Sequence, residues 1–124
     1  IQSAALMPLY LHSEVVDRSL IEAVADASAK AFLATGLLAS DDGGHKTVGY
    51  DYGMLLYGLV EMEHPDAEAV YHKVLDQIDQ TGAYTEYYLD GRPSGCPYRP
   101  WESAINMEAM IHFAQSLAEP SPAE

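Results

Sequence analysis

Carboxylates and aromatic residues are concentrated in one segment, residues 84–106, with the sequence YTEYYLDGRPSGCPYRPWESAIN. It contains three acids, two arginines, four tyrosines and the only tryptophan of the chain, and its glycines and prolines disfavour regular structure. Glu86 lies among three of the tyrosines, and aromatic rings beside a carboxylate offer flat faces for sugar rings. Glu86 is therefore a candidate catalytic carboxylate. A solvated loop glutamate is the ordinary alternative.

The other polar residues of this segment have structural explanations as well as functional ones. Trp101 is either a platform for a sugar or a core residue. Glu102 is stabilised by the start of a helix, which is a sufficient structural reason for it. Arg99 either contacts substrate hydroxyls or pairs with the acids of the segment, and pairing is the simpler interpretation. Asp90 precedes a glycine, which is typical of a turn.

The remaining candidate residues of the chain indicate no metal, cofactor or nucleophile. Asp41, Asp42 and His45 follow no EF-hand or zinc-ligand spacing, and the glycines between them predict a turn. Cys96 has no second cysteine to pair with and no close basic neighbour, so we do not expect it to act as a nucleophile. Phosphate-binding and dinucleotide-binding motifs are absent from the sequence, and we expect no organic cofactor.

Four helices are expected to position these residues. They cover residues 13–36, 51–63 and 65–82, and the fourth starts near Pro100. The first and third are amphipathic, whereas the second and fourth are apolar around most of their circumference. Because each helix of a four-helix bundle has one polar face, this alternation does not suit a bundle. It predicts an all-α chain of two helical hairpins in the order outer, inner, outer, inner.

The lengths of the connections predict where a site would form. Two long connections, LLASDDGGHKTVGY and AYTEYYLDGRPSGCPYRP, lead into the apolar helices, and a short one joins the second helix to the third. Long loops without structure of their own are usually functional. Both lie at the same end of the hairpins, so we expect them to build one site. Tyr50 from the first and Tyr88 from the second would contribute to substrate binding.

Composition limits the partners and the environment. The 124 residues suit a single domain, and a net charge of −13 with only six lysines and arginines argues against binding nucleic acid or an anionic membrane. No apolar run approaches the ~20 residues that span a bilayer, so we expect a soluble protein. The sequence does not determine the compartment, and the cytoplasm is slightly favoured. Because it starts with Ile rather than Met, we expect a piece of a longer protein.

Two segments resemble a known family. TEYYLDGRPSGCPYRPWESA resembles the final loop and inner helix of the (α/α)6 toroid glycoside hydrolases, namely the trehalase, mannosyl-oligosaccharide glucosidase, glucoamylase and glycogen-debranching groups. There, a glutamate in an S/T-E-x-Y/F-D pattern precedes a glycine-containing turn and a helix that starts with W-S or W-x-S. The upstream segment LMPLYLHSEVVDRSLIEAVADASAKAFLATGLLAS is similar to an outer helix of these enzymes. Leu89 replaces the aspartate of the pattern, Glu102 intervenes between Trp and Ser, and GYDYGMLL replaces G-Y-W-R-G-x-V-W.

The resemblance implies that residues 1–124 form one α-helical segment, the C-terminal third of a larger (α/α)6 catalytic domain. It implies that Glu86 is the general base of an inverting hydrolysis and that Trp101 lies near the sugar. Tyr50, Tyr88, Arg99 and Glu102 are further candidates for substrate binding. The general acid, and cover for the apolar helices, would come from the remainder of the catalytic domain or from a companion chain.

We therefore expect a glycoside hydrolase that acts on an α-glycosidic oligosaccharide or glycoside. In the inverting mechanism, one acid protonates the leaving oxygen while a carboxylate activates water on the opposite face of the sugar. This chemistry needs no metal and no cofactor. Two alternatives remain open. In the first, the chain is a non-enzymatic acidic helical subunit that binds a partner through its apolar helices. In the second, it belongs to a phosphorylase or a polysaccharide lyase with the same toroid.

Overall fold

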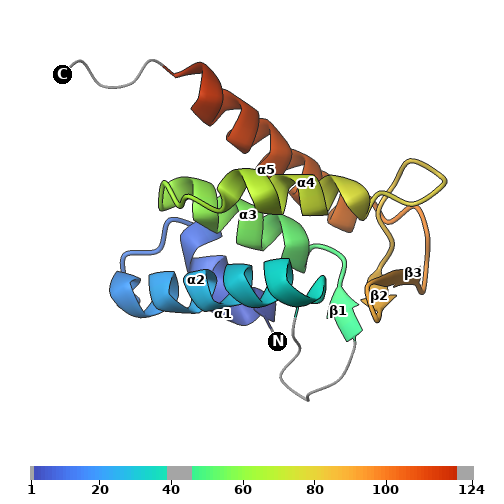
Figure 1. The fold of residues 1–124 in the computed structure, drawn as a ribbon, viewed down its shortest axis with the longest axis horizontal. Coiled ribbons are helices and arrows are strands. Elements are labelled where there is room, and N and C mark those ends of the chain that lie inside the picture. The colour runs from blue at the N-terminus through green and yellow to red at the C-terminus, as the bar shows by residue number, and fades with distance from the viewer. Residues whose placement is uncertain (1, 39–45, 120–124) are drawn as a thin grey trace.

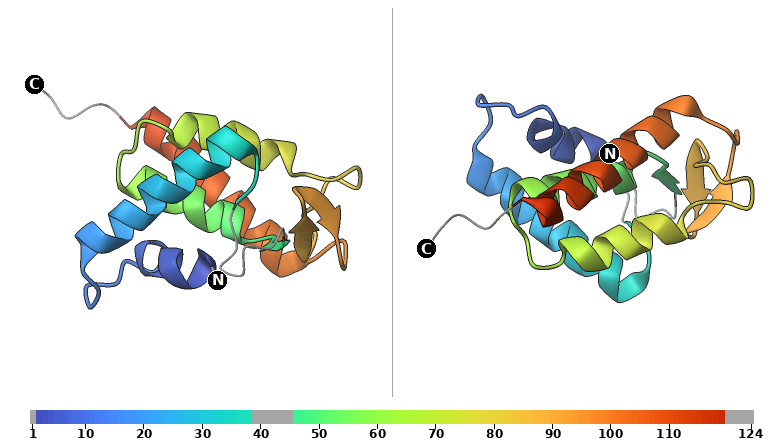
Figure 2. Two further views of the ribbon diagram at one scale, coloured as in Figure 1. Left: turned by 60° about the horizontal axis from the view of Figure 1, so that its bottom comes forward. Right: turned by 90° about the horizontal axis from the view of Figure 1, so that it is seen from above.

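The computed structural model describes residues 2–38 and 46–119, which form five helices and three short strands (Figure 1). The helices are α1 (Gln2–Tyr10), α2 (Arg18–Thr35), α3 (Asp51–Glu61), α4 (Ala67–Asp76) and α5 (Pro100–Ala118). The strands are β1 (Lys46–Val48), β2 (Tyr87–Leu89) and β3 (Arg92–Ser94). Helix α3 contacts each of the other four helices. The sheet stands at one end of the helices, next to the starts of α3 and α5 (Figure 2).

The prediction of an all-α chain made of two hairpins of a toroid is wrong. The described residues form a mixed α/β structure, because both long connections contain strands. The strands make an antiparallel sheet in the order β1-β2-β3. Asp90 and Gly91 form the tight turn between β2 and β3, both with positive φ, as type I′ hairpin turns require. The turn predicted at Asp90 is confirmed, but it joins strands rather than ending a loop.

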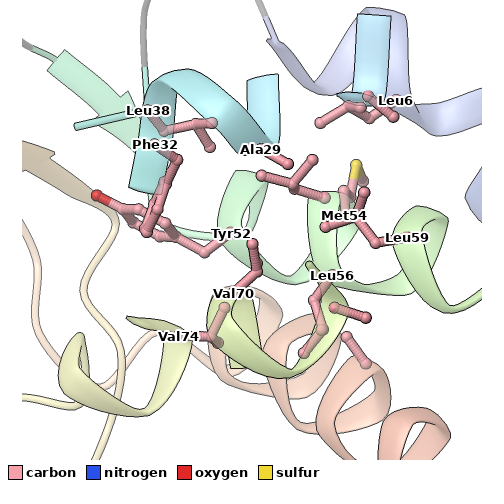
Figure 3. Close-up of a cluster of buried hydrophobic side chains, with 14 of the residues drawn as sticks. Leu6, Ala29, Phe32, Leu38, Tyr52, Met54, Leu56, Leu59, Val70 and Val74 are labelled. Carbon is pink, nitrogen blue, oxygen red and sulfur yellow. The ribbon is translucent and has the colours of Figure 1, made fainter. Parts of the chain in front are cut away.

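Helix α3 is buried within the chain itself. Most of its residues are buried, in agreement with its apolar sequence. Helix α1, which the sequence analysis did not predict, packs Leu6 and Leu9 into the same core. Phe32 of α2 and Val74 of α4 close the core from other sides (Figure 3). The expectation that both apolar helices lack cover within this chain is therefore wrong for α3.

The helix ends follow local chemistry. Gly36 ends α2 in the left-handed conformation (φ 74°), and Pro100 occupies the first turn of α5, both as predicted. Helix α2 starts later than expected, because Asp17 rather than Ser13 caps it. The Asp17 carboxylate accepts hydrogen bonds from the backbone N–H of Ser19 at 3.0 Å and from its hydroxyl at 2.7 Å.

A close crossing of α3 and α5 sets the position of the site. A Cβ on Gly53 would lie 2.5 Å from Asn106 Oδ1 and 2.7 Å from Asn106 Cα, so only glycine fits there. The amide of Asn106 donates a hydrogen bond to the carbonyl of Gly49 at 2.8 Å, just before α3 begins. The start of α3 is thus fixed against the first turns of α5.

No helix of the described residues is long and apolar enough to cross a membrane.

Candidate functional site

The sheet joins the two long connections at one site, as the sequence analysis expected. Thr47 of β1 pairs with Tyr88 of β2, which brings the start of α3 next to residue 86. The N–H of Gly49 donates to the carbonyl of Glu86 at 2.9 Å, and the N–H of Glu86 donates to the carbonyl of Cys96 at 3.0 Å. The backbone of Glu86 is therefore held on both sides, while its side chain is 42% exposed. The structure thus fixes the position of residue 86 and leaves its carboxylate accessible from solvent.

Arg99 stands between two carboxylates of very different exposure. Its Nη1 lies 3.9 Å from Oε1 of Glu86, and its Nε donates to Oε2 of Glu102 at 3.4 Å. The Glu102 side chain is only 2% exposed. The carboxylates of Glu102 and Glu86 raise the pKa of Arg99, so the guanidinium stays charged. The simpler interpretation of Arg99, pairing with neighbouring acids, matches this geometry.

Glu102 is enclosed because the chain before α3 passes directly over it. A Cβ on Gly49 would lie 2.9 Å from Glu102 Cγ and 2.1 Å from the carbonyl of Thr85. Without a side chain at residue 49, these three segments approach closely enough to cover the carboxylate. The Glu102 carboxylate is therefore buried and contacts the half-exposed Arg99 side chain. Its part in substrate binding stays a prediction, and its position indicates that it would act by holding Arg99.

Two of the aromatic candidates, Trp101 and Tyr50, lie next to each other. Trp101 is 63% exposed, and its ring centroid lies 6.5 Å from that of Tyr50 in an edge-to-face arrangement. This exposure argues against the role of a core residue, and the role of Trp101 as a platform for a sugar stays a prediction. Tyr50 is half-buried and immediately precedes α3. One edge of the molecule therefore carries four of the candidates, namely Glu86, Arg99, Trp101 and Tyr50. We call this edge the rim.

Tyr88, by contrast, lies beneath that rim. It is fully buried, its hydroxyl donates to the carbonyl of Gln77 at 2.8 Å, and its ring packs edge-on against Tyr52 at 5.1 Å. Burial raises the pKa of Tyr88. These contacts explain the residue structurally. Its role in substrate binding stays a prediction that would require the rim to open.

The sequence analysis did not select the buried polar residues that support the site. Asn106 and Thr85 are buried, and the hydroxyl of Thr85 donates to the carbonyl of Tyr87 at 2.9 Å. Thr47 on β1 is also buried and donates to the carbonyl of Leu38 at 2.8 Å. A signal for Asn106 was present in the sequence, because an amide inside an otherwise apolar helix usually has a buried partner. The threonines carried no comparable signal.

Other chemistry is limited in the part of the chain that the structure describes. Residues 2–38 and 46–119 contain no group of three or more His, Cys, Asp and Glu side chains placed to hold a metal ion. Asp41, Asp42 and His45 lie outside the described residues. Cys96 is exposed, and its thiol lies 3.5 Å from the carbonyl of Pro97.

Comparisons with known proteins add no family to this picture. No protein-family model matches the chain, and the searches of curated proteins and of solved structures gave no match either. What the site can do chemically thus follows from its own residues. It presents one solvent-facing carboxylate, a guanidinium beside it, the exposed ring of Trp101 and the half-buried ring of Tyr50.

Proposed function

We propose that this chain supplies the general base, Glu86, of a glycoside hydrolase that cleaves an α-glycosidic oligosaccharide or glycoside with inversion. One observation carries the proposal. Glu86 is a half-exposed carboxylate whose backbone is fixed by Gly49 and Cys96, at a rim that also holds the exposed ring of Trp101. The motif resemblance described above supports the same residue. The proposal uses the fold only for the position of these residues, which the mixed α/β structure brings to the same rim.

In this mechanism Glu86 accepts a proton from water as the water oxygen attacks the anomeric carbon. The bond from that carbon to the leaving oxygen breaks, and a general acid donates a proton to the leaving oxygen. The two carboxyl groups of inverting enzymes stand roughly 6.5–9.5 Å apart, which leaves room for the water. Glu102 is buried on the inner side of Arg99. As the resemblance implies, we assign the acid to the remainder of the catalytic domain or to a companion chain.

Arg99 and the aromatic pair have positioning roles in this proposal. The Arg99 guanidinium lies beside the Glu86 carboxylate, with Nη1 3.9 Å from Oε1, and would hold the carboxylate in place. Trp101 and Tyr50 would contact the apolar face of the sugar ring. Arg99 also contacts the buried Glu102, and this second contact helps to fix the guanidinium next to Glu86.

The experiment uses the full-length protein that contains this chain and the variant Glu86→Gln, which keeps shape but cannot accept the proton. Turnover of α-linked oligosaccharides and aryl α-glycosides should fall by at least ~100-fold, the usual contribution of a positioned base. KM should change little, since the lost interaction belongs to the transition state. Proton NMR of the first-formed product should show the opposite anomer from the substrate.

Asp90→Asn is the matched control, because Asp90 is an acid of the same segment that lies in the β2–β3 turn. It should leave turnover near normal. Azide added to Glu86→Gln should restore part of the turnover by replacing the activated water. Near-normal turnover in Glu86→Gln, or a product that retains the anomeric configuration, would exclude Glu86 as the base. Turnover that requires phosphate instead of water would indicate a phosphorylase.

A further inference from the structure

A groove with almost entirely apolar walls lies between α1 and α5, and Trp101 of the candidate site forms part of its lining. Met7 and Leu11 line one side, Trp101 and Ile105 line the other, and Met54 of α3 also contributes to it. The groove has a volume of about 540 Å³. Leu11 is 61% exposed and Met7 is 38% exposed, although both are large apolar side chains. Large apolar side chains that lie exposed side by side in a groove indicate a binding surface.

The apolar surface continues along the outer side of α5. Ala104, Met107, Ile111 and Ala114 recur at spacings of three and four, so they share one face of the helix, and all are exposed. Met107 is 56% exposed and Ile111 is 52% exposed. A helix of 19 residues is about 28 Å long at 1.5 Å per residue. This surface therefore has the length and the periodicity of a binding site for another helix.

The surface beside the C-terminal end of α5 carries several acidic side chains. A second pocket of about 670 Å³ lies between the C-terminal half of α5 and the connection from α3 to α4. Its walls include Glu61, Glu63, Glu68 and Glu119, and no lysine or arginine. Between this pocket and the groove, the carboxylate of Glu108 accepts a hydrogen bond from the hydroxyl of Tyr10. An occupant that follows α5 would pass from an apolar groove to a cluster of carboxylates.

We propose that α1, α3 and α5 form a docking surface for a partner protein that presents a basic amphipathic helix. The apolar face of that helix lies in the groove and along Met107 and Ile111, and its lysines or arginines reach the acidic pocket. Charge selects this occupant over a second copy of the chain, because two molecules of charge −13 repel each other. The docking surface shares Trp101 with the candidate site, but its test uses no substrate, so it can fail without affecting the proposed function.

The test uses two synthetic 18-residue helical peptides with the same apolar pattern, one with lysine and one with glutamate on the polar face. Trp101 is the only tryptophan of the chain and lines the groove, so its fluorescence reports occupancy directly. The lysine peptide should shift the Trp101 emission to the blue in a saturable way. Added NaCl should weaken its binding, and the glutamate peptide should produce no shift.

Variants then locate the surface. Ile111→Ser and Leu11→Ser should each weaken binding of the lysine peptide by at least ~10-fold, the loss expected for a buried contact residue. Glu68→Gln combined with Glu119→Gln should weaken binding and reduce its salt dependence. Leu20→Ser is the matched control, because Leu20 is 62% exposed but lies on α2, away from the groove. Circular dichroism checks that each variant folds.

Four outcomes would overturn the proposal. Equal binding of both peptides would indicate unspecific apolar contact, and absence of any shift with the lysine peptide would exclude the surface. A loss with Leu20→Ser as large as that with Ile111→Ser would place binding elsewhere. A blue shift that grows with protein concentration, without peptide, would assign the groove to a second copy of the chain.

Discussion

At the scale of single residues, two tyrosines on either side of Glu86 anchor the candidate site. The hydroxyl of Tyr84 donates to the carbonyl of Val74, and that of Tyr88 to the carbonyl of Gln77, both at 2.8 Å. Both acceptors lie at the end of α4 or just beyond it. Because residues 84 and 88 are tied there, the segment that carries Glu86 has little freedom to move. The chemistry of the rim thus depends on buried hydrogen bonds behind it.

Removing one of these hydroxyls tests the anchor. Tyr84→Phe keeps the ring and deletes a buried hydrogen bond, so the free energy of unfolding should fall by about 1 kcal/mol. Tyr98→Phe is the control, because Tyr98 is 65% exposed, and it should leave the stability unchanged. Urea denaturation followed by circular dichroism measures both variants. Equal effects of the two substitutions would show that the Tyr84 hydroxyl contributes nothing specific.

The same buried tyrosines predict how stability depends on pH. Burial raises the pKa of Tyr52, Tyr84 and Tyr88, and the hydrogen bond to Glu108 together with burial raises that of Tyr10 to about 12. An unfolded tyrosine has a pKa of about 10 and releases its proton first, so above this pH the folded state binds more protons. Stability is thus fully present below pH ~10 and is lost as pH rises toward the folded pKa values.

Urea denaturation at pH 8.5 and at pH 11 measures this loss. The free energy of unfolding should be lower at pH 11, and the difference between the two pH values should be smaller for Tyr84→Phe, which has one buried phenol fewer. Tyr98→Phe should show the same pH dependence as the unmodified chain. A stability that rises between the two pH values would contradict the assignment of these tyrosines as buried and protonated.

At the scale of elements, the crossing of α3 and α5 determines the geometry of the rim. Gly53→Ala raises helix propensity by roughly 1 kcal/mol, but its Cβ would meet the backbone of Asn106. A backbone atom cannot move aside alone, so we expect the steric effect to dominate and to cost about 1–3 kcal/mol. Gly58→Ala on the same helix meets only the side chain of Leu9, at 3.0 Å, and should be close to neutral. Thermal unfolding compares the two variants.

If Gly53→Ala were as close to neutral as Gly58→Ala, α3 and α5 would not be in close contact at Asn106. The site then provides a second measurement. Separation of the two helices would break the hydrogen bond from Asn106 to the carbonyl of Gly49. Gly49 also binds the backbone of Glu86, so Gly53→Ala should reduce activity of the full-length protein as well as stability.

At the scale of the whole molecule, the net charge of −13 acts against the compact state through self-repulsion. Raising NaCl from 0.01 M to 0.1 M shortens the screening length from ~30 Å to ~10 Å, so the melting temperature should rise. A variant with Glu63→Gln and Glu68→Gln should melt higher at low salt and gain less from NaCl. Scanning calorimetry measures both effects, and a melting temperature that falls with NaCl would contradict this account.

The sequence was sufficient where local chemistry determines the structure. The stop of α2 at Gly36, the start of α5 at Pro100 and the turn at Asp90 follow from allowed backbone conformations, which depend on the residue itself. The burial of α3 follows from its composition. The sequence also placed the acids, arginines and tryptophan of the rim within residues 84–106, because they are neighbours along the chain.

The tertiary structure determined what depends on distant partners. Three-residue strands are too short to show alternation, and Pro8 argues against α1, so both exist because of contacts with other elements. The exposure of each rim residue was likewise open in the sequence. Glu102 is buried because Gly49 and Thr85 pass over it, whereas Trp101, its immediate neighbour, points into the groove between α1 and α5. Adjacent residues in the first turn of a helix face different directions, and only the packing of distant segments decides which direction is covered.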